Sequence, residues 1–176
     1  MAADFEIAET SPRGNQGAWS VTTDGSNRVL KLQTNNSGST FNLCVNRDVT
    51  ARDADLSVRL RVDSGEEDQA GGLVWRYQDA NNYYVARINP LEANFWLYRV
   101  VAGKRTQLAG ERANAKTGQW VALRIVHVGD QIDCYLDGQR VMAAKDRSIM
   151  QPGRVGLWTK ADASTSFDDL AVTGAK

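Results

Sequence analysis

The feature that most constrains the fold is a strict alternation of apolar and polar residues over positions 56–63. The apolar positions are Leu56, Val58, Leu60 and Val62, and the polar positions are Ser57, Arg59, Arg61 and Asp63. Successive side chains of a β-strand point to opposite faces of its sheet, whereas a helix needs apolar residues three or four positions apart. The segment therefore predicts a strand with one face in a core and the other in solvent.

Residues 71–89, with the sequence GGLVWRYQDANNYYVARIN, predict two further strands joined by a polar turn at 78–82. One face of this hairpin is apolar and carries Leu73, Trp75, Tyr77, Tyr84, Ala86 and Ile88. The other face places Arg76 beside Tyr83 and Arg87. Because these side chains make a cationic and aromatic surface, we interpret this face as the functional one.

Shorter alternating segments and turns with Gly or Asp continue along the chain, and no segment of useful length has the period of a helix. Many short strands at regular spacing predict an all-β fold, a two-sheet antiparallel β-sandwich of the jelly-roll kind. We expect residues 1–176 to form a single domain of this kind. The predicted core comprises Leu56, Val58, Leu60, Trp75, Tyr84, Leu97, Leu123, Ile125, Leu136 and Leu157.

The charge and hydropathy of the chain exclude several classes of partner. The 21 basic residues balance the 21 acidic ones, so a nucleic-acid partner is not expected. No apolar run approaches the roughly 20 residues that span a bilayer, so membrane insertion is not expected either. The first residues, MAADFEIAET, lack the basic and apolar regions of a signal peptide. We favour an extracellular or periplasmic protein whose leader was removed over the cytoplasmic alternative, and the oligomeric state stays open.

The cysteines and the single histidine are expected to be structural. Cys44 and Cys134 each lie in an apolar run, which favours two small buried side chains, although the pattern leaves a disulfide open. His127 is in phase with Leu123 and Ile125 at the end of a predicted strand. A lone histidine in such a place is more often part of the fold than of a catalytic site.

Four segments of the chain carry a resemblance to a known family. They are residues 71–89 and the stretches GERANAKTGQW, DQIDCYLDGQRV and RVGLWTKADASTSFDDLAV. These segments resemble the concanavalin A-like lectin/glucanase superfamily, with its laminin G-like jelly rolls, and most of all the bacterial 3-keto-disaccharide hydrolase-like family. The resemblance covers roughly residues 53–173 and implies two stacked antiparallel sheets, one of which is curved and binds sugars on its concave face.

On this frame, the alternation predicts which side chains line the concave face. The candidate saccharide-binding residues are Arg76, Tyr83, Arg87, Trp96, Tyr98, Trp158 and Lys160. Aromatic rings stack on the CH faces of sugars, and Arg and Lys donate hydrogen bonds to their oxygens. Related jelly rolls also carry a structural calcium near the termini, for which Asp4, Asp168 and Asp169 are the candidates; no other metal or cofactor is expected.

The predicted function is carbohydrate recognition by a lectin-like domain, and a small glycoside-processing enzyme that uses the same groove is the alternative. The Glu-x-Asp-x-x-Glu motif of family 16 glucanases is absent, and the predicted groove holds no pair of carboxylates for ordinary glycoside hydrolysis. Cleavage of a 3-keto glycoside requires fewer catalytic groups, because one base and an oxyanion stabiliser suffice for elimination. Tyr83, Tyr98 or His127 could be that base, and the catalytic residues stay unassigned.

Overall fold

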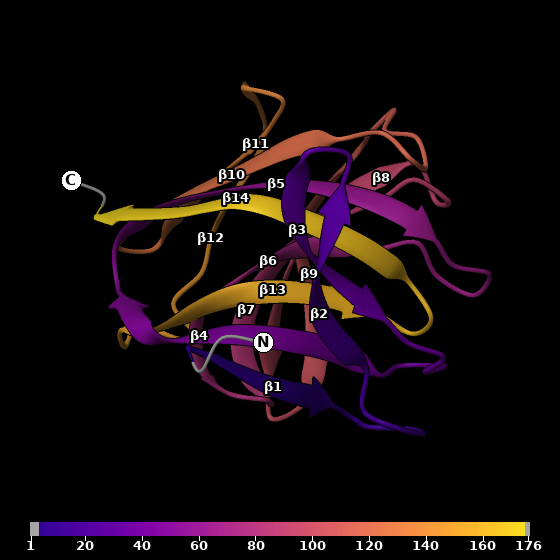
Figure 1. Ribbon diagram of the computed structural model, residues 1–176. Coiled ribbons are helices and arrows are strands. Elements are labelled where there is room, and N and C mark those ends of the chain that lie inside the picture. The colour runs from indigo at the N-terminus through magenta and orange to yellow at the C-terminus, as the bar shows by residue number, and fades with distance from the viewer. Residues whose placement is uncertain (1–3, 175–176) are drawn as a thin grey trace.

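The computed structural model describes residues 4–174, which form fourteen strands in two antiparallel sheets and contain no helix (Figure 1). Sheet A has the order β1 (Phe5–Thr10), β4 (Phe41–Ala51), β13 (Gly153–Lys160), β6 (Gly71–Asp79), β7 (Asn82–Asn89), β8 (Asn94–Val101), β9 (Lys104–Arg112). Sheet B has the order β12 (Gln139–Lys145), β11 (Gln131–Leu136), β10 (Val121–Val128), β5 (Ala54–Ser64), β14 (Ser164–Gly174), β3 (Asn27–Gln33), β2 (Ala18–Asp24). The predicted all-β sandwich is confirmed, and the described residues contain no helix that could span a membrane.

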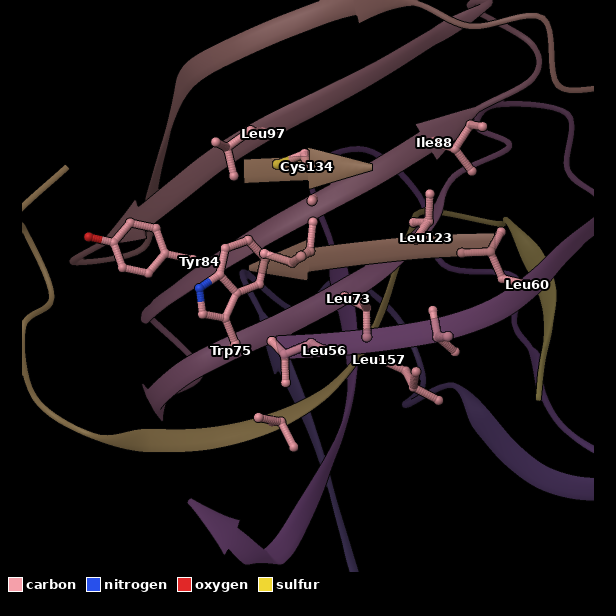
Figure 2. Packing of buried hydrophobic residues seen from close by; sticks show 14 of the residues in the cluster. Leu56, Leu60, Leu73, Trp75, Tyr84, Ile88, Leu97, Leu123, Cys134 and Leu157 are labelled. Carbon is pink, nitrogen blue, oxygen red and sulfur yellow. The ribbon is translucent and has the colours of Figure 1, made fainter. Parts of the chain in front are cut away.

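The main core lies between the two sheets, and the period-two pattern predicts it well. Figure 2 shows residues of β5 and β10 from sheet B packed with residues of β6, β7, β8 and β13 from sheet A. Every predicted core residue is buried except Leu136, which is half-buried at the end of β11. Cys44 and Cys134 are free thiols in this core, so burial raises the pKa of Cys44 to about 12 and that of Cys134 further still.

The alternation breaks at one point in β6, and this break overturns a prediction. Arg76 has a φ of 44°, and the pairing of β6 with β7 changes register after Trp75. This irregularity puts Tyr77 on the outer face of sheet A, where the sequence pattern had predicted the core face. It also turns Arg76 away from the outer face, where the same pattern had placed it beside Tyr83 and Arg87.

Candidate functional site

The outer face of sheet A is strongly concave, because the sheet curls until side chains of its distant strands meet. The guanidinium of Arg105 on β9 lies 4.8 Å from the ring centroid of Phe41 on β4, although four strands separate these two in the sheet. In a flat sheet, strands about 4.8 Å apart would hold them more than 20 Å from one another. Thr10 on β1 likewise meets the Tyr83 hydroxyl on β7, at 2.8 Å.

Side chains fill the middle of this concave face and form a second hydrophobic cluster. Its members include Phe41, Leu43, Val45, Val74, Tyr77, Tyr83, Val85, Tyr98, Val100 and Trp158. Two of the predicted site residues, Tyr83 and Trp158, are on the predicted face but have no exposed surface at all. Burial raises the pKa of Tyr83 to about 12, so at neutral pH this phenol is protonated and is not a base. These two side chains make the floor of the concave face and offer no ring for a sugar to stack on.

Polar side chains gather on the same face towards the ends of β7 and β8. We call this group the concave cluster, and it consists of Asp68, Arg87, Glu92, Asn94, Trp96, Tyr98, Arg105 and Lys160. Four of the predicted site residues belong to it: Arg87, Trp96, Tyr98 and Lys160. The prediction that the groove holds no pair of carboxylates is wrong, because Asp68 and Glu92 both belong to the cluster.

Arg87 is the centre of the concave cluster and is almost completely buried. Its guanidinium donates hydrogen bonds to Asn94, to Glu92 at 2.8 Å and to the Tyr98 hydroxyl at 3.4 Å. The pairing of β6 with β7 sets Gly72 opposite Arg87. A Cβ atom at Gly72 would come within 2.2 Å of the Ala86 carbonyl oxygen, so only glycine fits beside this arginine.

Trp96 is the large aromatic side chain of the cluster that remains partly exposed. It pairs with Gly110 of β9, where a Cβ atom would lie 2.4 Å from the indole Cδ1, so the glycine makes room for the ring. The guanidinium of Arg87 lies 4.8 Å from the indole centroid. Beside the ring is a hollow of about 500 Å³, which is lined by Glu92, Ala93, Asn94, Trp96, Gly110, Glu111 and Arg112.

Lys160 contributes to the cluster through an ion pair with a buried carboxylate. Its Nζ lies 2.5 Å from Asp68, which also accepts a hydrogen bond from Asn89 at 3.1 Å. Burial raises the pKa of Asp68 above its usual value, while the attraction of Lys160 opposes this shift. Sequence reasoning missed Asp68 because it falls in an acidic turn, at 64–68, whose composition predicts only a solvated loop.

Arg105 was also missed, because the sequence places it beside a turn with no pattern to mark it. It lies over three aromatic rings of the concave face, 4.4 Å from the centroid of Tyr98, 4.8 Å from that of Phe41 and 5.9 Å from that of Trp158. Its Nη1 is buried and has no acceptor among the described residues, as is also true of Nε of Arg87. The concave cluster therefore contains hydrogen-bond donors that no acceptor of the described residues satisfies.

Arg76 lies outside the cluster, which corrects its predicted role. Its guanidinium donates hydrogen bonds to the carbonyl oxygens of Arg52, Ile149 and Gly129, at 2.8 to 2.9 Å, and lies 3.4 Å from Asp53. These partners come from the β4–β5 turn, the β10–β11 turn and the loop before β13. Arg76 therefore ties three loops together at one end of the sandwich.

His127 is likewise a structural residue, as the sequence suggests, and it is not the base of a catalytic site on the concave face. It is buried between the sheets, where its Nδ1 accepts a hydrogen bond from the indole of Trp75 at 2.9 Å. Its ring meets Trp75 and Tyr84 edge to face. Burial, together with the charge of Arg76, lowers the pKa of His127 to about 4.

The three acidic residues proposed for calcium do not make a donor set. Asp168 accepts a hydrogen bond from Asn27 at 2.6 Å, and Asp169 faces Arg59 at 3.7 Å. Within residues 4–174, no three His, Cys, Asp or Glu side chains come together as a metal ion would require. A calcium ion near the termini thus stays a prediction from the resemblance.

Comparison with known proteins relates this geometry to a family. The structure is similar to the carbohydrate-binding module CBM66 from Bacillus subtilis, with a TM-score of 0.79 and 20% identity over 99% of both chains. It is also similar to a Bacillus subtilis protein of unknown function with a galectin-like fold (TM-score 0.69, 8% identity, 97% of this chain and 89% of that one). A GH43 protein from Bacillus licheniformis, BlXynB, is a further relative in structure (TM-score 0.60, 17% identity, 84% of this chain and 33% of that one).

At these identities the likenesses establish the fold, a jelly roll of the concanavalin A-like kind. No curated protein matches the sequence. A family match covers almost all of the described residues, from 5 to 173. The chain belongs to the family of 3-keto-alpha-glucoside-1,2-lyase-like domains.

Proposed function

We propose that the concave cluster binds a saccharide, with the exposed face of Trp96 and the free donors of Arg87 and Arg105 as the recognition elements. The observation that carries this proposal is the pairing of a partly exposed indole with buried donors that have no protein acceptor. Buried donors are almost always hydrogen-bonded in proteins, so donors without an acceptor point to a ligand with oxygen acceptors, and the hollow beside Trp96 offers room for one.

A sugar ring has the two kinds of surface that such a site requires. Its CH face can stack on the indole of Trp96, and its hydroxyl oxygens can accept hydrogen bonds from the guanidinium groups. Glu92 and Asn94 hold Arg87 in place from below, so its donors are fixed before a ligand arrives. Fixed donors lose little conformational entropy on binding, which favours affinity.

Two comparisons support a saccharide as the ligand. The family is described as resembling a lyase of 3-keto-alpha-glucosides, and the neighbour CBM66 is described as a carbohydrate-binding module. Both descriptions concern sugars, although one names an enzyme and the other a binding module. The sugar itself is left to experiment.

A glycan array followed by calorimetric titration of the best ligand tests this proposal. Trp96→Ala should weaken binding roughly tenfold or more, as the loss of a central aromatic contact does in other interfaces. Trp120→Ala is the matched control, because this indole is also partly exposed but lies under Arg59 and Arg61 of β5, at 5.2 and 5.0 Å. Equal affinities of both variants and the wild-type protein for every glycan would place the site elsewhere.

A second candidate is an elimination reaction on a 3-keto glycoside, which the buried carboxylate of Asp68 favours. A raised pKa makes this carboxylate a stronger base than an exposed one. It could take the proton from the carbon between the keto group and the glycosidic carbon. The enolate oxygen would lie against Arg87 or Lys160, and the glycosidic oxygen would leave with the bonding electrons and take up a proton from water.

Turnover of a 3-keto glucoside by the wild-type protein and by Asp68→Asn tests this second candidate. We expect activity in the wild-type protein and a loss of at least a hundredfold in the variant, since general base catalysis contributes about 10²–10⁴-fold. Glu67→Gln is the matched control at the exposed neighbouring position. An inactive wild-type protein that still binds the glycoside would leave binding as the function.

A further inference from the structure

Arg105 differs from every comparable cation in the described part of the chain. All other Arg and Lys residues of 4–174 that are buried or half-buried have a hydrogen bond or an ion pair within the protein; they are Lys31, Arg61, Arg76, Arg87, Arg99, Arg154 and Lys160. Arg105 has neither among these residues. It instead lies over the rings of Tyr98, Phe41 and Trp158.

This position is unfavourable for a lone positive charge. Burial lowers the pKa of Arg105, and the charge of Arg87 lowers it further, while the more distant charge of Asp68 opposes the shift only in part. A partly buried charge without a counter-ion is destabilising, and contact with aromatic rings recovers only part of the cost. A charge that is kept in such a position therefore favours a negative partner from outside the chain.

Within the cluster, Arg105 is the cation that lacks an anionic partner, because the other two cations are already paired. Glu92 neutralises Arg87, and Asp68 neutralises Lys160. With Arg105 included, the cluster has three cationic and two anionic side chains. A ligand with one negative charge would complete this balance without displacing either existing ion pair.

The structure assigns an acidic saccharide, a uronate, as the class of ligand, with Arg105 as the residue that receives its carboxylate. The planar guanidinium matches the two oxygens of a carboxylate, which it can bind through two parallel hydrogen bonds. Arg105 and Arg87 both face the ring of Tyr98, so a sugar held by Arg87 and Trp96 would lie close to Arg105. This inference rests on the proposed saccharide site and specifies what that site selects.

Matched ligands that differ only in charge test the inference. Oligosaccharides of galacturonic or glucuronic acid and their methyl esters share the sugar ring, but the esters carry no charge. We expect the wild-type protein to bind one of these acids at least tenfold more tightly than its ester at pH 7. Added salt should weaken the binding of the acid and leave that of the ester nearly unchanged.

Variants of Arg105 test whether this side chain causes the preference for the acid over the ester. Arg105→Gln should abolish the tenfold preference, because it should weaken the binding of the acid far more than that of the ester. Arg105→Lys keeps the charge but not the paired donors and should retain only part of the preference. Arg28→Gln removes the same charge from an exposed position on β3 of sheet B and should leave the preference unchanged.

Each outcome decides between the two proposals. If esters and neutral glycans bind as tightly as the acids, the uronate inference is wrong and the saccharide site stands. The same holds if a sulfated sugar binds better than every uronate. If Arg105→Gln does not fold, the comparison of acid and ester on the wild-type protein still gives the answer. The absence of binding by any saccharide, charged or neutral, would overturn both proposals.

Discussion

A guanidinium is buried both at the end of the sandwich around Arg76 and in the concave cluster around Arg105. The two regions differ in whether the protein supplies hydrogen-bond acceptors for it. Around Arg76, three backbone carbonyl oxygens and Asp53 take up the donors of the guanidinium. Around Arg105, the described residues provide aromatic rings and no acceptor. The two arginines are alike in chemistry and differ in what surrounds them.

The difference shows how a structural arginine can be told from a recognition arginine. A buried polar group whose partners are complete stabilises and rigidifies the fold, and it has nothing left to offer a ligand. A buried polar group with free donors costs stability until a ligand arrives. By this criterion Arg76 maintains the fold, and the concave cluster is the proposed site.

The largest expected effect is on the stability of an Arg76→Ala variant. Removal of this side chain leaves three carbonyl oxygens without their donors, that of Ile149 buried and the other two partly buried, so the free energy of unfolding should fall by about 3–5 kcal/mol. Urea denaturation measures this change, with Arg105→Gln as the matched control at a site without partners. The control should change the free energy of unfolding by about 1 kcal/mol or less. Similar losses in both variants would contradict the distinction between the two regions.

A smaller effect on stability is expected for Arg87→Ala, because Arg87 both stabilises the fold and belongs to the proposed recognition site. Its hydrogen bonds to Glu92 and Asn94 stabilise the fold, so the free energy of unfolding should fall by about 2 kcal/mol. Its Nε has no acceptor among the described residues and is one of the donors of the proposed site, so saccharide binding should weaken roughly tenfold or more. From sequence alone no loss of stability is expected, because an outward side chain would leave the core untouched. Denaturation and calorimetry on the same variant separate the two effects.

An effect of similar size concerns the pH dependence of stability at the Arg76 end. The pKa of His127 is lowered from 6.5 to about 4 in the folded protein, so the unfolded chain binds a proton first as the pH falls. The contribution of this residue to stability is complete above pH 6.5 and is lost as the pH falls from 6.5 towards 4. Between pH 7 and pH 5 the expected loss is about 2 kcal/mol.

A His127→Asn variant isolates this contribution, because the amide oxygen can still accept the hydrogen bond from Trp75. The other titratable groups act alike in both proteins, so the difference between the two stability curves reports His127 alone. The wild-type protein should lose about 2 kcal/mol more than the variant between pH 7 and pH 5. Parallel curves would mean that this histidine is accessible to protons in the folded state.

The sequence by itself determined the fold class, the core and much of the concave face. Period-two alternation is a local property of the chain, and it correctly placed Leu56, Leu60 and Leu123 in the core. For the same reason it placed Arg87, Trp96, Tyr98 and Lys160 on the outer face of sheet A. The resemblance then supplied the architecture and the family.

Only the tertiary structure decided which of these side chains a ligand could reach. The irregular backbone at Arg76 is set by pairing with neighbouring strands, so the alternation could not show that this residue turns away. The curl of sheet A buries Tyr83 and Trp158, and it brings Asp68 and Arg105 to the cluster from turns at its edges. Curvature is a property of seven strands together, and the pattern of any single strand carries no information about it.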